Sequence, residues 1–248
     1  MKVIDLGEGL LVFMFDPPPG EFEGLNLLAL VDGGEALLLD TGYKENLREA
    51  LAHLEGMGAR PTKAVISHYH PDHADGLALL PGLETWGHAA FQETLDRCFR
   101  PERHASLAPR HAISARESLA FGRHRLELIP MPGHTPDSIC VAVDGRVMYA
   151  ADLLLFTNGG EPVLPSVHAR PVSLHADALK KLRGYLDMTF VPGHGAPVPD
   201  RAARERDLSN RISYVEAIAA RPGIGLEEAQ ASCSPRFLGS EWHEENWK

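Results

Sequence analysis

Short apolar runs separated by turn residues dominate the first forty positions of the chain. The runs are Leu10–Phe15, Leu27–Val31 and Ala36–Leu39, and each has the length of a buried strand. Asp32-Gly33-Gly34 lies between the last two, and glycine adopts positive φ without strain, so this tripeptide predicts a hairpin turn. The pattern therefore predicts consecutive strands at the start of the chain.

The spacing of apolar residues then changes to a helical period. Lys44–Met57 has an apolar residue at every third or fourth position, which predicts a helix, and Phe91–Phe99 also predicts one. Between them, Ala64–Ile66 has the apolar character of a short strand. Proline and histidine are scattered through Arg100–Arg116, so we expect an irregular lid or substrate loop there.

The second half of the chain repeats this order of strands followed by helices. We expect strands at Arg125–Ile129, Ile139–Val143, Val147–Ala150 and Met188–Val191, and helices at Leu174–Leu186 and Ala202–Ala219. Strand blocks each followed by helices predict two sheets packed face to face with helices outside, a four-layer α/β/β/α sandwich. We expect a catalytic domain over residues 1–200, with the C-terminal helix and tail of residues 201–248 packed on it.

Composition and charge limit the classes of partner that we expect the protein to bind. The chain has 248 residues, 44% of them hydrophobic, which is enough for one large domain or two small ones. Its formal net charge of −10 disfavours nucleic acid, because proteins that bind phosphate backbones usually carry the opposite charge. Early acidic residues argue against a signal peptide, and no apolar stretch has the length of a membrane span. We expect a small-molecule substrate and no membrane, and the oligomeric state stays open.

The three cysteines indicate the redox compartment. Cys98, Cys140 and Cys233 are scattered and show no Cys-x-x-Cys spacing. Such cysteines are typical of reduced, mostly structural thiols. We therefore expect a cytoplasmic protein.

The strongest chemical signal is the heptapeptide Ser67-His68-Tyr69-His70-Pro71-Asp72-His73. It places three imidazoles and a carboxylate within six residues, directly after a predicted strand. Neutral imidazole nitrogens and aspartate oxygens are the ligands of hydrolytic zinc sites. The heptapeptide therefore predicts a metal site at a strand end.

Three more segments place a metal-competent side chain after a strand and a turn. They contain His134 in Pro-Gly-His-Thr-Pro-Asp-Ser, Asp152 after Tyr-Ala-Ala, and His194 in Pro-Gly-His-Gly. The glycines beside the two histidines allow a sharp turn and a close approach to a metal. Each segment alone is a weak signal, but in this order behind the heptapeptide they reinforce one another.

Together with Asp40 at the end of an earlier strand, these residues resemble the five motifs of the metallo-β-lactamase superfamily. The resemblance extends from about Leu10 to Gly195 and implies binuclear metallohydrolases with an αββα sandwich fold. It implies the ligand assignment: His68, His70 and His134 for one metal, Asp72, His73 and His194 for the other, and Asp152 bridging both. It also implies that Asp40 is a supporting carboxylate that orients a ligand; a strand-end turn or helix cap is the alternative for Asp40.

The chemistry of such a site follows from its parts. Two metals about 3.5–4 Å apart lower the pKa of a water toward about 7 and polarise a carbonyl, so a metal-bridging hydroxide becomes the nucleophile. Asp72 would bind through one oxygen, and the other would orient the hydroxide and later carry its proton as the catalytic residue. Gly-x-Ser-x-Gly is absent, which argues against a serine hydrolase. We expect two zinc ions, with iron or manganese also possible in their place.

Within the superfamily, His73 and Asp152 favour glyoxalase II-like thioesterases and lactonases. We therefore expect hydrolysis of an ester, thioester or lactone of a small molecule. The run Gly133–Ser138 resembles that of some true β-lactamases, so amide hydrolysis stays open. Three more classes stay open as well: a mononuclear-iron persulfide dioxygenase, a phosphodiesterase or nuclease of the same fold, and a non-catalytic metal-binding sensor.

Several residues are weaker candidates for the pocket. We expect its walls to come from residues 100–116 and 156–168, with Phe156, His111 and His168 as candidate substrate contacts. Tyr69 and Tyr149 could offer a hydroxyl beside the metals, although Tyr149 is more typical of a core. The C-terminal helix carries Arg201, Arg204, Arg206 and Arg211, which we interpret as a solvated face rather than a patch for glutathione.

Overall fold

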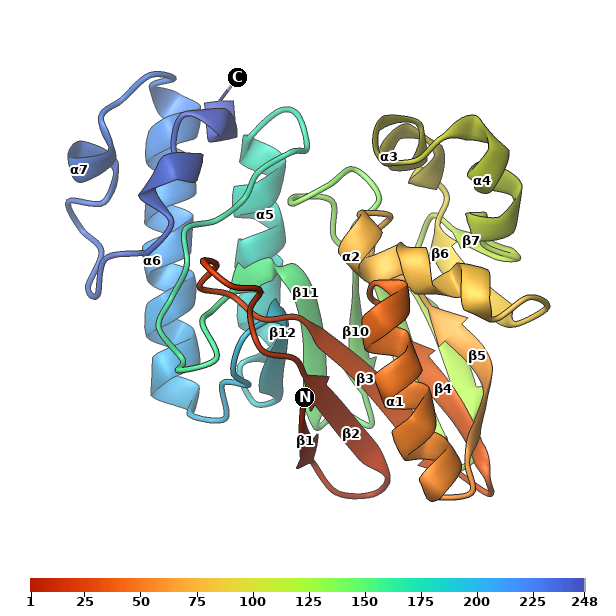
Figure 1. Cartoon of the computed structure of the whole chain (residues 1–248). Coiled ribbons are helices and arrows are strands. Elements are labelled where there is room, and N and C mark those ends of the chain that lie inside the picture. Colours follow the sequence, from red (N-terminus) through yellow and green to blue (C-terminus); the bar gives the residue numbers. More distant parts are fainter. Residues whose placement is uncertain (248) are drawn as a thin grey trace.

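Two mixed β-sheets with helices on their outer faces form the molecule, and the computed structural model describes residues 1–247 (Figure 1). The first sheet has seven strands in chain order. They are β1 (Lys2–Asp5), β2 (Leu10–Met14), β3 (Asn26–Asp32), β4 (Glu35–Leu39), β5 (Arg60–Val65), β6 (Glu84–His88) and β7 (His111–Ile113). Strands β1 to β4 pair antiparallel and β4 to β7 pair parallel.

The second sheet has five strands in the order β12-β11-β10-β9-β8. They are β8 (Glu117–Phe121), β9 (His124–Pro130), β10 (Ile139–Val143), β11 (Val147–Leu155) and β12 (Thr189–His194). Only β11 and β12 pair parallel, and the other neighbours are antiparallel. The four-layer α/β/β/α sandwich predicted from the sequence is confirmed.

Helices cover the outer face of each sheet. They are α1 (Lys44–Gly56), α2 (Pro71–Ala74), α3 (Phe91–Cys98), α4 (Pro101–Leu107), α5 (Ser173–Leu182), α6 (Arg201–Ala220) and α7 (Leu226–Ala229). Short 3₁₀ turns lie at η1 (Asp75–Leu79), η2 (Arg183–Tyr185), η3 (Ser240–Trp242) and η4 (Glu245–Trp247). Figure 1 shows α1 against the first sheet and α5 with α6 beside the second. In the part of the chain that the structure describes, no helix is long and apolar enough to cross a membrane.

Strand β4 illustrates how the sequence builds these layers. Successive side chains of a strand point to opposite faces. Leu37 and Leu39 accordingly pack between the two sheets with Val141 of β10. Leu38 packs on the other face with Leu47 of α1. Because both faces are buried, the strand reads as a continuous leucine run rather than an alternation.

The structure corrects three expectations about secondary structure. Residues Arg100–Arg116 are not irregular, because they contain helix α4 and strand β7. Strands β1, β6 and β8 were not expected from the sequence; the first and last are short strands with partly exposed side chains, which weakens the apolar signal. The expected helix at Leu174–Leu186 ends at Leu182 and continues as the 3₁₀ turn η2.

Candidate metal centre

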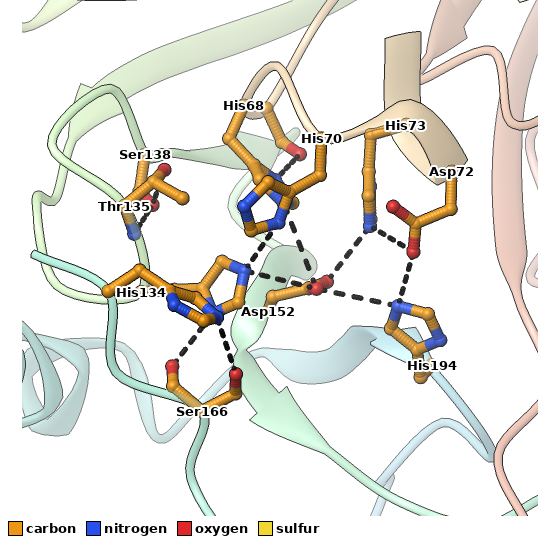
Figure 2. A network of polar contacts seen from close by, with 12 residues as sticks. His68, His70, Asp72, His73, His134, Thr135, Ser138, Asp152, Ser166 and His194 are labelled. Atoms are coloured by element: carbon orange, nitrogen blue, oxygen red, sulfur yellow. Dashed lines mark hydrogen bonds and ion pairs between the residues drawn. The ribbon is translucent and has the colours of Figure 1, made fainter. Parts of the chain in front are cut away.

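The side chains of the heptapeptide leave the end of β5 and meet residues from three other segments. The chain extends through His70 and then turns into the short helix α2, whose first residue is Pro71. Proline suits this position because it needs no backbone N–H there. The turn places Asp72 and His73 on the opposite side of the centre from His68 and His70, with Asp152 between them (Figure 2).

Three imidazoles converge on one side of the centre and form the first ligand group, which we define as His68, His70 and His134. His70 Nδ1 lies 3.0 Å from His68 Nε2 and 3.0 Å from His134 Nε2. Asp152 Oδ2 lies 3.5 Å from His134 Nε2 and 3.8 Å from His68 Nε2. These four ligand atoms all lie within 4.8 Å of one another.

The second ligand group, which we define as Asp72, His73 and His194, meets the same aspartate from the other side. Asp72 Oδ2 lies 3.3 Å from His194 Nε2 and 3.6 Å from His73 Nε2. Asp152 offers Oδ1 at 3.2 Å from His73 Nε2 and Oδ2 at 3.4 Å from His194 Nε2. The ligand atoms of this set also lie within 4.8 Å of one another.

For His134 and His194, a hydrogen bond from the other ring nitrogen fixes which nitrogen faces the centre. His134 Nδ1 donates to the carbonyl of Ser166 at 2.7 Å, and His194 Nδ1 donates to the carbonyl of Gly24 at 2.9 Å. A carbonyl only accepts, so the proton sits on Nδ1 and the Nε2 lone pair points inward. This is the orientation that histidine ligands of metals generally show.

Asp40 orients the second ligand group and the strand end together. Its carboxylate accepts from His73 Nδ1 at 2.7 Å, from the Ser67 hydroxyl at 2.6 Å and from the Tyr149 hydroxyl at 2.5 Å. It also accepts from the Ser67 backbone N–H at 2.6 Å. Asp40 has φ of 62°, a left-handed conformation that costs energy for a residue other than glycine and occurs often at functional sites.

Close backbone approach brings Asp152 to the middle of the centre. Ala151, the residue before it, has φ of 46°, again in the left-handed region. On the facing strand, a Cβ at Gly193 would lie 2.0 Å from Asp152 Oδ1. Only glycine therefore leaves room for this carboxylate beside β12.

The residues present fit a divalent metal site. In the first ligand group, His68 Nε2 and His134 Nε2 both face His70 Nδ1, which can donate at most one proton. Near the second, the buried atoms His73 Nε2 and Asp152 Oδ1 have no hydrogen-bond partner within residues 1–247. Buried polar atoms without partners are costly, and a cation among them removes that cost. Imidazole and carboxylate together suit zinc, iron or manganese.

The pKa shifts separate the two ligand groups. Burial lowers the pKa of His68 and His134 well below the ordinary value and lowers the pKa of His70 to about 4. Burial acts in the same direction on His73 and His194, but Asp152 and neighbouring carboxylates outweigh it and raise the pKa of both. The first ligand group is therefore neutral imidazole, whereas protons compete for the second.

A cavity of about 290 Å³ opens beside the second ligand group and includes Asp72 and His194 in its wall. Sequence reasoning missed two other ionisable residues of this wall, Glu23 and Tyr43. Burial, opposed by His194, raises the pKa of Glu23 to about 7. Both residues come from loops far from the heptapeptide in sequence, and the Pro-Pro-Pro-Gly turn before Glu23 signals only a loop.

Not every candidate from the sequence reaches the centre. Tyr69 is buried among the residues packed on the first sheet, and His111 stacks on Trp86 at the far strand β7. Tyr149 is buried as expected, although its hydroxyl reaches Asp40. Phe156 is buried in the core. The ring of His168 lies 5.4 Å from that of His70 and 5.2 Å from that of His134.

The interpretation of the C-terminal arginines as one solvated face is wrong for two of them. Arg211 is fully buried and donates to the carbonyls of Leu155 and Val163 and to Asp207. Arg204 is also buried and donates to the carbonyl of Leu186. Both guanidinium groups satisfy backbone oxygens inside the molecule, so neither is available to a substrate.

Three named proteins are similar to the chain in sequence. The chain is 28% identical to the hydroxyacylglutathione hydrolase of Anaeromyxobacter dehalogenans over 82% of its own length and 75% of that protein. It is 29% identical to the human mitochondrial persulfide dioxygenase ETHE1 over 68% of its own length and 66% of that protein. A third relative, a hydroxyacylglutathione hydrolase of Xanthomonas oryzae, is 30% identical over 49% of the chain and 42% of that protein.

Solved structures share the fold at lower identity. The metallo-beta-lactamase from Pontibacter korlensis matches with a TM-score of 0.68 and 18% identity, over 87% of this chain and 98% of that one. The DIM-1 metallo-beta-lactamase matches with a TM-score of 0.65 and 18% identity, over 87% of this chain and 97% of that one. A family model for the metallo-beta-lactamase superfamily matches residues 24–194, the span that holds both ligand groups. The chain therefore belongs to the metallo-beta-lactamase superfamily and is a metal-dependent hydrolase.

Proposed function

We propose that the protein is a binuclear hydrolase that binds two zinc ions and cleaves an ester, thioester or lactone bond of a small molecule. The observation that carries the proposal is the position of Asp152. Its carboxylate lies within 4 Å of ligand nitrogens from both groups, through Oδ2 to His134 and through Oδ1 to His73. A single carboxylate between two ligand groups would be able to bridge two cations, one held by each group.

When bound, two divalent cations supply a nucleophilic water near neutral pH and polarise the scissile carbonyl. The chain's own residues hold and orient the reactants. Asp72 faces His73 and His194 through Oδ2. Its remaining oxygen would orient the attacking water and accept its proton. Asp40 keeps His73 in one tautomer and one orientation throughout.

Three further observations bear on substrate and setting. The cavity of about 290 Å³ has the scale of a small-molecule site. Two of the relatives described above are named hydroxyacylglutathione hydrolase, which supports a thioester. The net charge of −10 disfavours nucleic acid as a partner, and the three free cysteines support a cytoplasmic location.

The test combines metal analysis with a substrate panel. Purified protein is loaded with zinc, its metal content is measured, and hydrolysis of a chromogenic thioester, a lactone and a cephalosporin is followed. We expect two metals per chain and turnover of the thioester or the lactone. Asp187→Asn, at an exposed carboxylate far from the centre, is the matched control for carboxylate substitutions and should behave as wild type.

Two outcomes would overturn the proposal. Two bound metals with no hydrolysis of any substrate would instead indicate a metal-binding protein without turnover. Because one relative is named persulfide dioxygenase, protein loaded with ferrous iron in place of zinc, which has no redox chemistry, is also given glutathione persulfide and followed with an oxygen electrode. Oxygen uptake on that substrate, in place of hydrolysis on the others, would assign a different reaction.

A further inference from the structure

The loop after β11 holds the first ligand group from one side. The Ser166 carbonyl accepts from His134 Nδ1 at 2.7 Å, and Figure 2 shows Ser166 directly beside that ring. The His134 carbonyl in turn accepts from the backbone N–H of His168 at 2.7 Å. The side chain and the backbone of this ligand are therefore both tied to residues 166–168.

The loop is itself held by the C-terminal tail. Asn246, in η4, is 2% exposed, and its amide spans Ser166 from both sides. Its Oδ1 accepts from the Val167 N–H at 2.9 Å, and its Nδ2 donates to the Pro165 carbonyl at 2.7 Å. One side chain thus binds the residues immediately before and after the carbonyl that orients His134.

Asn246 is fixed in turn by a buried chain of hydrogen bonds. Its Nδ2 also donates to the Tyr214 hydroxyl on α6 at 3.0 Å. The Ile224 carbonyl accepts from His243 Nε2 at 2.8 Å, so His243 Nδ1 is free to accept from the Tyr214 hydroxyl at 2.9 Å. Each N–H and O–H hydrogen in this network has one acceptor, the two amide hydrogens of Asn246 included, which sets the direction of each bond and leaves the amide a single orientation.

Figure 1 shows the dark-blue tail lying along α6, and η4 contacts that helix. The family model ends at residue 194, so these contacts come from a segment beyond the matched span. Upstream, the tail pairs with the same loop, because Leu164 N–H donates to the Leu238 carbonyl and Leu238 N–H donates to the Pro162 carbonyl. The tail therefore forms hydrogen bonds to the loop at two places, Leu238 at Pro162 and Leu164, and Asn246 at Pro165 and Val167.

We propose that Asn246 is a positioning residue of the metal centre, which acts through the Ser166 carbonyl to hold His134 in its ligating orientation. The inference rests on the proposed metal-binding function and deepens it. Partners that orient metal-bound histidines typically change metal affinity about 10–100-fold when removed. Asn246 acts one step further from the metal. Asn246→Ala should therefore lower the metal affinity of the first ligand group by about tenfold, the lower end of that range.

The matched control is Asn210→Ala. Asn210 is likewise a buried asparagine that holds the tail, through both the N–H and the carbonyl of Ser234. Within residues 1–247, its side chain forms no hydrogen bond to the loop at Pro165–Val167. If Asn246 served only to anchor the tail, the two substitutions would have the same effect on the metal centre.

The experiment measures metal affinity by competition with a chromophoric chelator and records ¹¹³Cd NMR spectra of the cadmium-loaded protein. We expect Asn246→Ala to shift the ¹¹³Cd resonance of cadmium at the imidazole-rich first ligand group and to lower the metal affinity of that group about tenfold. Asn210→Ala should leave the resonance and the affinity unchanged. Urea unfolding of the metal-free proteins compares the free energy of unfolding that each of the two variants loses. Asn246→Asp keeps the acceptor for Val167 N–H and should fall between wild type and Asn246→Ala.

Equal affinities and spectra for wild type, Asn246→Ala and Asn246→Asp would overturn the inference. So would equal losses in Asn246→Ala and Asn210→Ala, because the tail would then contribute only stability. If Asn246→Ala does not fold, Asn246→Asp decides by the same readouts. Wild type that binds no divalent metal at this centre would overturn the proposed function itself, and the inference with it.

Discussion

The two ligand groups meet at Asp152 but are built on different physical terms. The first consists of imidazoles alone, whose pKa values burial lowers. The second combines imidazoles with carboxylates, and Asp152 and Asp72 contribute to raising the pKa values of His73 and His194. The first group is thus ready to bind a cation at neutral pH, whereas the second must release protons but offers more negative charge.

Two of the imidazoles, one from each group, also differ in what orients them. Asp40, a side chain, accepts from His73 Nδ1, whereas the backbone carbonyl of Ser166 accepts from His134 Nδ1. A substitution of Asp40 removes the acceptor of His73 directly. The Ser166 carbonyl belongs to the backbone, so its position can be changed only through residues that hold the loop. Similar ligands in one centre can therefore depend on distant parts of the chain.

The largest expected effect comes from the carboxylate that the groups share. Asp152→Asn removes negative charge from both groups and places an amide N–H near ligand nitrogens. We expect zinc content to fall to one ion or fewer per chain and hydrolysis to fall to background, measured by elemental analysis and the substrate panel. Two bound metals with full activity in this variant would break the bridging assignment, and Asp187→Asn controls for loss of a carboxylate elsewhere.

Lowering the pH should separate the groups. His73 and His194 have raised pKa values, so protons compete there as the pH falls below those values. For each bound proton that the metal displaces, affinity should fall about tenfold per pH unit. The pKa of His70 is about 4, so the first group should keep its affinity between pH 7 and pH 5.

Competition titrations at pH 7.5, 6.5 and 5.5 check this order of loss. From the sequence alone, imidazole ligands predict only one fall in affinity below about pH 6. Simultaneous loss of both metals over one pH range would show that the two groups behave as a single coupled site.

Asp40→Asn should lower the metal affinity of the second ligand group and leave that of the first unchanged. His73 Nδ1 loses its carboxylate acceptor, and a loss of this kind typically costs about 10–100-fold in metal affinity. The control is Asp137→Asn, because Asp137 is also buried and accepts from the Tyr69 N–H and the Thr94 hydroxyl, and within residues 1–247 it forms no hydrogen bond to a ligand imidazole. Equal weakening of both groups in Asp40→Asn would assign Asp40 mainly to holding Ser67 and the strand end.

The sequence predicted the parts that depend on local spacing. The heptapeptide is contiguous, His134 and His194 each follow a Pro-Gly pair, and Asp152 follows a predicted strand, so all seven candidate ligands could be named before the structure. The structure brings all seven together. The two sheets could also be predicted, because their central strands are buried on both faces and read as apolar runs.

What the sequence did not predict depends on contacts between distant segments. Arg211 looks like a surface residue of a helix, yet it is buried because the carbonyls of Leu155 and Val163 lie within its reach. The role of Asn246 depends on a loop eighty residues upstream. No short pattern in the chain marks either residue, since the partners are backbone groups that every residue carries.

A further prediction concerns stability rather than metal affinity, and it involves His175, which is fully buried and lies against Gly133. Its Cα lies 3.0 Å from where a Cβ of Gly133 would be, directly before His134. Burial lowers the pKa of His175 to about 3. Its folded pKa is therefore below the unfolded value, so its neutral form is compatible with folding above about pH 6.5 and stability is lost as the pH falls from there toward 3.

In His175→Leu this loss disappears, because leucine takes up no proton in the unfolded chain. The free energy of unfolding of wild type relative to His175→Leu should fall by about 1.4 kcal/mol per pH unit between pH 6 and pH 4. Urea unfolding of the metal-free proteins at several pH values measures this difference, and the other histidines cancel because both proteins carry them. A difference that stays constant with pH would mean that the folded protein accommodates the protonated ring. Burial would then not be what keeps the imidazoles of this region neutral, and the contrast between the two ligand groups would rest on the carboxylates alone.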